Sequence, residues 1–360
     1  MSVLCKNGDY IILDHRSYTA GLYKDVVQND PKKCTYALAA KLFKIVNNKK
    51  NVNRKRTLDY EILLKETKAV EQIYEKMLKE ISDSIKNHIL SNCMLLNENV
   101  REHAQNLFQS TIFDHAGLRG GNNSDKPLKC KIKEEYFLMP NNVPNDTFFL
   151  ISSKIYNIFL CGCVKEQCKN LAGNKYDIMI ADPPWWNKYI RRLKGANSKL
   201  SYSMMYNEDI ADIPVEQLFS SNCLIAVWCT NAPSNVAAVK NLIFPKWGVE
   251  YVATWYWLKI TINLEPVCNF GTGCKKQPYE RIMLGKVGEV KDVPDGQLII
   301  SVPSALHSHK PPLLDLLSPY VSVENPNILE LFARYLLPNT TSVGYEPLKW
   351  QHISLYDDIK

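Results

Sequence analysis

Residues 178–188, with the sequence IMIADPPWWNK, decide the fold of this chain. The apolar run 176–181 predicts a buried β-strand, and Asp182 follows it immediately. Pro183 cannot extend a central ladder, because proline has no N–H to donate, so the chain must leave the sheet at this point. The segment therefore predicts a carboxylate at the carboxyl end of a buried strand, which is where open α/β sheets bind their ligands.

The same kind of strand recurs along the second half of the chain. Helical segments lie between several of the strands, and Pro214 and Pro233 are each placed to open a helix in its first turn. Nearly continuous apolar strands that alternate with helices predict a largely parallel sheet covered on both faces. The predicted strands lie at 148–151, 155–160, 176–181, 223–228, 251–258, 297–302 and 327–332.

The turn after the strand is rich in hydrogen-bond acceptors and poor in donors. Neither proline has an N–H, while the Asp182 carboxylate and the Pro183 carbonyl both accept. Together with the flat ring of Trp185, they suit a planar ring that bears an exocyclic amine. Two acceptors stabilise the positive charge that develops on such an amine when it attacks a methyl group held in line. We predict a catalytic set of Asp182, Pro183, Pro184 and Trp185.

Length, composition and net charge limit the class of protein that this chain can be. The 360 residues are 46% hydrophobic, enough for one large domain and a smaller one, and the net charge of +7 permits a nucleic-acid partner without requiring one. The N-terminus lacks the pattern of a signal peptide, and no apolar run approaches the roughly 18 residues of a membrane span. The 11 cysteines show no secreted framework or paired zinc spacing, so we expect reduced thiols inside a cell and no metal.

Three regions differ in texture. Residues 1–56 form a mixed segment whose end, 41–56, carries seven basic residues and no acid. This patch suits phosphate contact or nuclear import, or is simply a solvated surface, and we expect a nuclear protein with a cytoplasmic pool as the alternative. Residues 57–144 are predicted to contain a helical region, to about residue 109, and a linker at 115–127, and 145–360 are the α/β domain. The helix is predicted from one apolar stripe: Val70, Ile73, Tyr74, Met77, Leu78, Ile81 and Ile85.

Several further segments follow the Asp-Pro-Pro-Trp turn in a fixed order. They are AVWCTN, WYWLKI, KKQPYERIMLG, VPSALHSHKPPL and LELFARYLLPNTTSVGYEPLKWQH. Together they resemble the MT-A family of adenosine-N6 methyltransferases, close to the methyltransferase-like protein four branch, over most of 148–352. The resemblance implies a Rossmann-like S-adenosylmethionine-dependent methyltransferase with a smaller, partly helical N-terminal region. In this family the catalytic motif precedes the cofactor motif, which accounts for the absence of a glycine-rich motif before Asp182.

The resemblance also implies where the cofactor binds. Arg334 would reach the ribose hydroxyls or the carboxylate of S-adenosylmethionine, since Arg suits both. Tyr345 stands where the family has Asn. His307 and His309 have a spacing that suits a metal pair, but no third ligand is evident and the family has no metal. The implied cofactor residues are Ile180, Ala181, Asp182, Lys276, His309, Lys310, Glu330, Phe332, Arg334, Gly344, Tyr345 and Glu346.

The segment after the turn predicts substrate contacts. Five basic residues and no acid lie between Pro184 and Leu200, so this loop is placed to hold the phosphates that flank a base, or else is merely solvated. Tyr202 and Trp257 would wall the pocket, although aromatic residues lie in cores by default. The predicted substrate residues are Trp186, Asn187, Lys188, Arg191, Arg192, Tyr202, Asn231 and Trp257.

The sequence thus favours an N6-adenine methyltransferase that acts on nucleic acid as a monomer without a required protein partner. Branch likeness points to 2′-O-methyladenosine in small nuclear RNA, and DNA adenine is the alternative substrate. In either case the base must be unstacked to reach the site. Two further hypotheses stay open: an inactive scaffold that binds RNA or a sister subunit, and a methyltransferase for protein or small-molecule amines.

The basic loop provides a first prediction. Combined replacement of Lys188, Arg191 and Arg192 by Gln removes three positive charges, so RNA affinity should fall and its salt dependence should become shallower, while cofactor affinity is unchanged. Filter binding of RNA at several salt concentrations, together with calorimetric titration of the cofactor, measures both. A parallel loss of both affinities would show that the loop is structural.

Overall fold

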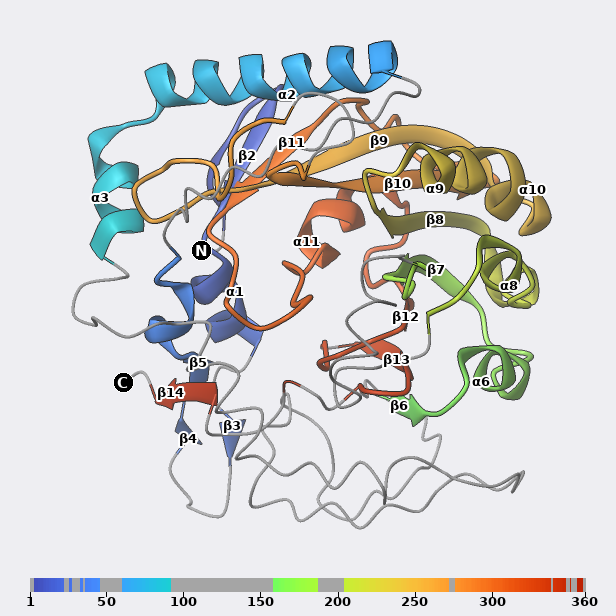
Figure 1. The fold of residues 1–360 in the computed structure, drawn as a ribbon. Coiled ribbons are helices and arrows are strands. Elements are labelled where there is room, and N and C mark those ends of the chain that lie inside the picture. The colour runs from blue at the N-terminus through green and yellow to red at the C-terminus, as the bar shows by residue number, and fades with distance from the viewer. Residues whose placement is uncertain are drawn as a thin grey trace, which may run out of the picture.

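The computed structural model describes residues 3–22, 26–27, 33–34, 36–45, 60–91, 158–186, 204–271, 276–337, 339–347, 350 and 355–358. The described residues form a central sheet with helices on both faces (Figure 1). In spatial order the sheet contains β1 (Val3–Lys6), β2 (Tyr10–Leu13), β11 (Leu298–Ser301), β9 (Glu250–Lys259), β10 (Tyr279–Val287), β8 (Phe219–Cys229), β7 (Tyr176–Ala181), β12 (Ile328–Leu331), β13 (Thr340–Gly344) and β6 (Ile158–Cys161).

Most neighbouring strands are parallel. The pairs from β6 through β13, β12 and β7 to β8 all run the same way, as do the pairs of β9 with β11 and β11 with β2. Strand β10 lies antiparallel between β8 and β9, and β1 lies antiparallel at the edge. The prediction of a largely parallel α/β sheet is confirmed. Two small sheets, β14 (Tyr356–Asp358) with β5 (Tyr36–Leu38) and β3 (Val26–Val27) with β4 (Lys33–Cys34), lie apart from it.

Alternation along β7 divides the core between the two faces of the sheet. Ile178 and Ile180 belong to one buried cluster, whereas Met179 and Ala181 belong to another on the opposite face, as the two-residue repeat of a strand requires. The first face is covered partly by the 3-10 helix η1 (Ala40–Phe43), α11 (Leu314–Leu317) and the 3-10 helix η6 (Ser318–Tyr320). The second face is covered partly by α6 (Val164–Asn170), α8 (Asn207–Ala211) and the helix that begins at Pro233.

The two prolines predicted to open helices behave differently. Pro233 is the first residue of α9 (Pro233–Ala238), which continues through the π-helix η5 (Val239–Ile243) into α10 (Phe244–Lys246). Pro214 is followed only by the 3-10 turn η4 (Glu216–Leu218), because β8 begins at Phe219 and leaves no room for a longer helix.

The N-terminal regions pack against the sheet. Strands β1 and β2 lie beside β11, so residues 3–13 extend the same sheet as the α/β domain, although the sequence assigned them to a separate segment. After β2 comes α1 (His15–Leu22). The apolar stripe was predicted as one helix, but the chain breaks it into α2 (Tyr60–Glu80) and α3 (Asp83–Ser91), with Ile81 between them. Its buried members pack with Tyr10, Leu258 and Tyr279, so α2 covers one face of the sheet (Figure 1).

Strand β10 was not predicted. Glu280, Arg281 and Lys286 interrupt its apolar pattern, and Gly285 lies within it. The glycine is needed here, because a Cβ at this position would meet the side chains of Val249 and Phe244. An antiparallel strand inside a parallel sheet is recognised only when its partners β8 and β9 are in place. The strand predicted at 148–151 lies outside the described residues, as does the linker at 115–127.

The packing of α2 can be tested through Met77, which has an exposed fraction of 0%. Met77→Ala leaves a cavity between helix and sheet, so the free energy of unfolding should fall by about 2–5 kcal/mol. Lys79→Ala, on the exposed face of the same helix, is the control and should change stability by less than about 0.5 kcal/mol. Urea denaturation measures both, and equal effects would mean that α2 does not pack on the sheet.

Candidate active site

One edge of the sheet gathers the chemistry-bearing side chains. Strands β7, β12, β13, β6, β8, β9, β11 and β2 all end there, and β10 begins there because it runs the other way. Asp182 follows β7, and Arg334 lies three residues beyond the end of β12. The topology therefore brings residues about 150 positions apart to one place, as expected for ligand sites in open α/β sheets.

The Asp182 carboxylate lies between two cations. Arg334 Nη1 donates to Asp182 Oδ2 at 2.5 Å, and Lys310 Nζ lies 3.6 Å from Oδ1. Ser308 Oγ also donates to Oδ2, at 3.4 Å. The side chains of Asp182, Lys310 and Arg334 are only 15%, 12% and 9% exposed, so solvent screens this cluster weakly.

The two oxygens of Asp182 therefore differ. Oδ2 accepts from Arg334 and Ser308, whereas the 3.6 Å to Lys310 leaves Oδ1 without a hydrogen bond to that cation. The neighbouring Pro183 carbonyl accepts the Trp185 N–H at 2.8 Å and keeps a second lone pair. Asp182 Oδ1 and the Pro183 carbonyl thus retain the acceptor capacity that an exocyclic amine needs.

A second carboxylate extends the cluster. Lys310 donates to Glu280 Oε2 at 2.5 Å, and Lys259 donates to Glu280 Oε1. Burial disfavours charge on Glu280, but the two lysines outweigh it and hold its pKa well below the usual range. Burial likewise opposes charge on Lys310, yet Asp182 and Glu280 raise its pKa overall. For Lys259 burial dominates, and its pKa is lowered.

Two tryptophans support these lysines. Lys310 Nζ lies 5.2 Å from the centre of the Trp228 ring, and Lys259 Nζ lies 4.5 Å from that of Trp257. The two rings meet edge to face with centroids 5.6 Å apart. Trp257 is 2% exposed and donates to Ser301 Oγ at 2.8 Å. Trp257, predicted to wall the substrate pocket, thus lies in the core and carries a cation on its ring.

Glu330 is a carboxylate in an unusual state. Its Oε2 is buried and has no hydrogen-bond partner among the described residues. Burial, with a smaller contribution from Asp182, raises the pKa of Glu330 to about 8. A carboxyl oxygen in this state is suited to accept a hydrogen bond from a hydroxyl group of a bound ligand, because an unsatisfied buried acceptor is costly.

The backbone is strained beside the carboxylate. Phe332 has φ of 63° and Ser308 has φ of 60°, the left-handed region that bulky residues rarely adopt. The turn containing Phe332 approaches β13 so closely that a Cβ on Gly344 would lie 3.1 Å from Ala333 N. Gly344, predicted to contact the cofactor, therefore permits the turn that places Arg334.

The two tryptophans of the motif point differently. Trp185 is 6% exposed, and its Nε1 donates to the Trp228 carbonyl at 2.9 Å, so its ring is packed inward and anchored on β8. The sequence predicted instead that one face of the Trp185 ring would be open to a substrate ring. Trp186 is half-buried and stacks on Tyr206, with ring centroids 6.0 Å apart and planes 18° apart.

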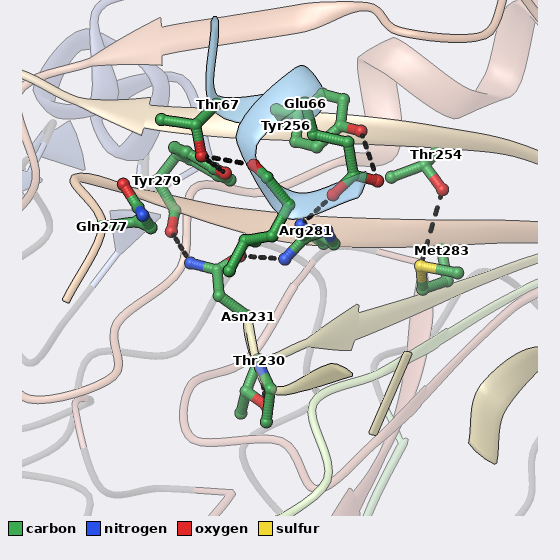
Figure 2. A network of polar contacts seen from close by, with 12 residues as sticks. Glu66, Thr67, Thr230, Asn231, Thr254, Tyr256, Gln277, Tyr279, Arg281 and Met283 are labelled. Atoms are coloured by element: carbon green, nitrogen blue, oxygen red, sulfur yellow. Dashed lines mark hydrogen bonds and ion pairs between the residues drawn. The ribbon is translucent and has the colours of Figure 1, made fainter. Parts of the chain in front are cut away.

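Asn231 takes part in a network that ties α2 to the sheet edge (Figure 2). Its Nδ2 donates to the Tyr279 carbonyl at 2.5 Å, and its Oδ1 accepts from Arg281, which also pairs with Glu66 of α2. Thr67 of the same helix lies 3.0 Å from the Tyr279 hydroxyl. Both ends of the Asn231 amide are therefore bonded to protein, and its predicted substrate contact stays untested.

His309 is buried away from solvent. Its ring stacks on Tyr335 with centroids 4.4 Å apart and lies 4.9 Å from that of His15, and none of the ring nitrogens of the two histidines has a hydrogen-bond partner among the described residues. Burial lowers the pKa of His309 well below its usual value and that of His15 to about 4. Both imidazoles are therefore neutral at pH 7.

The remaining predicted residues are dispersed. The side chains of Ile180 and Ala181 belong to the core. Lys276 is exposed near Lys259, whose pKa it lowers slightly, while Tyr345 is 55% exposed and Glu346 is half-buried. The substrate residues outside the described part of the chain are Asn187, Lys188, Arg191, Arg192 and Tyr202.

Sequence reasoning missed several members of the cluster. Lys259, Trp228 and Ser308 were not proposed as site residues, and Glu280 was proposed only to orient the loop that carries Lys276. Their common signal is a polar or aromatic residue at a strand end or in a proline-rich loop. Among the described residues, no group of His, Cys, Asp or Glu is arranged to hold a metal, and no helix has the length and apolarity to span a membrane.

A mostly parallel α/β sheet with an acidic Asp-Pro-Pro turn at the end of a central strand defines a Rossmann-like S-adenosylmethionine-dependent methyltransferase fold. Residues 176–346 match the MT-A70 family, and this part of the chain belongs to that family. The resemblance predicted from the motifs is confirmed for residues 176–346, and the relatives of this part of the chain include METTL4 proteins.

Three relatives illustrate the match. The human N(6)-adenine-specific methyltransferase METTL4 is 40% identical over 50% of this chain and 39% of its own length. The DNA N6-methyl methyltransferase of Caenorhabditis elegans is 42% identical over 58% of this chain and 56% of its own. The N6-methyladenosine RNA methyltransferase MTA1 of Cryphonectria parasitica is 35% identical over 54% of this chain and 59% of its own. The matches thus span about two fifths to three fifths of these relatives.

Glu330 generates a prediction for stability against pH. Its folded pKa of about 8 lies above its ordinary value of 4.5, so the folded state keeps a proton that the unfolded state releases. The stabilisation is complete below about pH 4.5 and is lost as pH rises through 8. Glu330→Gln cannot ionise and should flatten this decline.

Urea denaturation at pH 5.5 and 8.5 measures the effect on the free energy of unfolding. The control is Glu289→Gln, which changes an exposed carboxylate and should keep the wild-type slope. An unchanged slope in Glu330→Gln would show that the Glu330 carboxyl ionises normally in the folded chain.

Proposed function

We propose that this chain is an S-adenosylmethionine-dependent N6-adenine methyltransferase acting on nucleic acid, and that its substrate is 2′-O-methyladenosine in small nuclear RNA. The observation that carries the reaction is the Asp182 carboxylate at the end of β7, with one oxygen engaged by Arg334 and the other available. The family membership of residues 176–346 supports it, as do the N6-adenine activities named for the relatives.

Polar side chains near the ends of the strands suit the groups of the cofactor. Arg334 and Lys310 are buried cations suited to its carboxylate, and the unpartnered oxygen of Glu330 is suited to its ribose hydroxyls. When bound, S-adenosylmethionine supplies an electrophilic methyl group on a sulfonium. We assign the cofactor to this edge of the sheet, without a metal.

The amine chemistry falls to Asp182 and Pro183. Asp182 Oδ1 and the Pro183 carbonyl accept the two N–H groups of an adenine amine and stabilise the positive charge that builds on nitrogen during attack. Arg334 and Ser308 hold the other carboxylate oxygen and so fix its direction. No strong general base is needed, because a methylated ammonium is acidic and loses its proton readily.

RNA and DNA remain rival substrates. The relatives include one named for DNA and one named for RNA, so the names favour neither. An unpaired adenosine requires less unstacking than one in a duplex, which favours RNA loops and single strands. Nuclear location and action as a monomer are part of the same proposal.

The test is mass spectrometry of nucleosides after the full chain is incubated with S-adenosylmethionine and matched oligonucleotides. These are RNA with adenosine, RNA with 2′-O-methyladenosine, and single- and double-stranded DNA. We expect N6-methylated product mainly from the 2′-O-methyl RNA. Product mainly from DNA would show that the substrate is DNA and not 2′-O-methyl RNA. No product together with no cofactor binding would favour an inactive scaffold.

Asp182→Asn tests the reaction itself. The amide keeps the shape but loses the charge that stabilises the amine, so turnover should fall by about 100-fold or more. The matched control is Asp212→Asn, which removes an exposed carboxylate paired with Lys246 and should retain activity. Circular dichroism checks that both variants fold, and full activity of folded Asp182→Asn would exclude the proposed role of Asp182.

A further inference from the structure

An aromatic pair stands beside the catalytic turn and has no role in the chemistry described above. Trp186 follows the Asp-Pro-Pro-Trp turn directly, and its ring stacks on Tyr206 at 6.0 Å and 18°. Tyr206 is 56% exposed, an unusual fraction for a large aromatic residue. Since one face of the Tyr206 ring lies on Trp186, its exposure leaves the other face open to solvent.

The pair is joined rigidly to the catalytic turn. Trp186 N donates to the Met205 carbonyl at 2.9 Å, and Met205 N donates to the Pro184 carbonyl at 2.9 Å. These two bonds make a short parallel bridge between Trp185 and Met205. The ring that carries the open face is therefore fixed to the same backbone that places Asp182.

The backbone of Tyr206 is also held on its other side. Tyr206 lies at the start of α8, and its N–H donates to Asp209 Oδ2 at 3.2 Å. A ring whose backbone is fixed at both ends loses little conformational entropy when a planar group stacks on it. The pair is thus organised before any ligand arrives.

Charge distinguishes what this face would accept. Glu208 and Asp209 are exposed next to Tyr206 and repel phosphate. By contrast, the sequence between Trp186 and Met205 carries Lys188, Arg191, Arg192, Lys194 and Lys199 and no acid. Phosphates are therefore attracted by the sequence after the turn, whereas the aromatic face suits an uncharged planar group.

We propose that Trp186 and Tyr206 form a stacking platform for an unpaired base adjacent to the target adenine. This inference rests on the proposed function and deepens it, because it defines the substrate as a strand whose flanking base is free to leave its own stack. Stacking on an aromatic ring tolerates any base, since every base has a π-face. The platform therefore holds position along the strand and favours single strands over duplexes.

The experiment compares Tyr206→Ala, which removes the open ring, with Tyr206→Phe, which keeps it. The ligand is a single-stranded RNA nonamer with one central 2′-O-methyladenosine and 2-aminopurine at either neighbouring position. Tyr206→Ala should weaken binding and raise KM roughly tenfold, with kcat and cofactor affinity within about twofold of wild type. Tyr206→Phe should restore both, and 2-aminopurine should be quenched by wild type and Tyr206→Phe but not by Tyr206→Ala.

An abasic neighbour gives the decisive comparison. Replacing the flanking nucleotide by an abasic one should weaken binding to wild type but not further weaken binding to Tyr206→Ala, because both changes remove the same contact. Val323→Ala, an exposed apolar side chain before β12, is the control and should bind as wild type.

If Tyr206→Ala and wild type bind the RNA with equal affinity, the platform is wrong. It is also wrong if the variant and the abasic nucleotide weaken RNA binding additively. A loss of cofactor affinity in Tyr206→Ala would instead assign the pair a structural role. Binding and quenching need no turnover. Absence of methylation with the expected quenching would therefore reject the proposed function alone, while methylation without quenching would reject the platform alone.

Discussion

The ion pair between Asp182 and Arg334 is the interaction on which the rest of the site depends. Asp182 follows β7, Arg334 lies in the turn after β12, and both side chains are largely buried. A buried pair adds little net stability, but removing one partner typically costs about 3–5 kcal/mol because the other charge is left uncompensated. The pair therefore requires that β7 and β12 be neighbours in register and that the turn after β12 come back toward Asp182.

That requirement is met by a strained backbone. Phe332 adopts a positive φ so that the chain after β12 can turn at once, and Gly344 lets the turn pass close to β13. Ser308, also with a positive φ, brings its hydroxyl to the same carboxylate oxygen. Strain of this kind persists only where surrounding structure over-determines it, and here two buried clusters enclose the strands that carry it.

The lysines extend the same electrostatic arrangement across the sheet. Glu280 at the start of β10 joins Lys310 to Lys259, and Trp228 and Trp257 lie beneath these two cations. The next residue, Arg281, reaches Glu66 of α2 through the network that also holds Asn231 (Figure 2). Helix α2 thus fixes the start of β10, and with it the carboxylate that balances two buried lysines. This is a physical reason for residues 60–80 to pack on the catalytic sheet.

The sequence by itself determined the strand that ends at Asp182, the parallel α/β class, the helix stripe of residues 70–85 and the family. These follow from local periodicity, from proline at strand and helix ends, and from motifs in a fixed order, all of which act over a few residues. Only the tertiary structure decided that Trp185 points inward while Trp186 meets Tyr206, that β10 enters the sheet antiparallel, and that Asp182 lies between Arg334 and Lys310. Such contacts join residues up to about 150 positions apart, and their side chains have no preferred partner until the order of the strands is set.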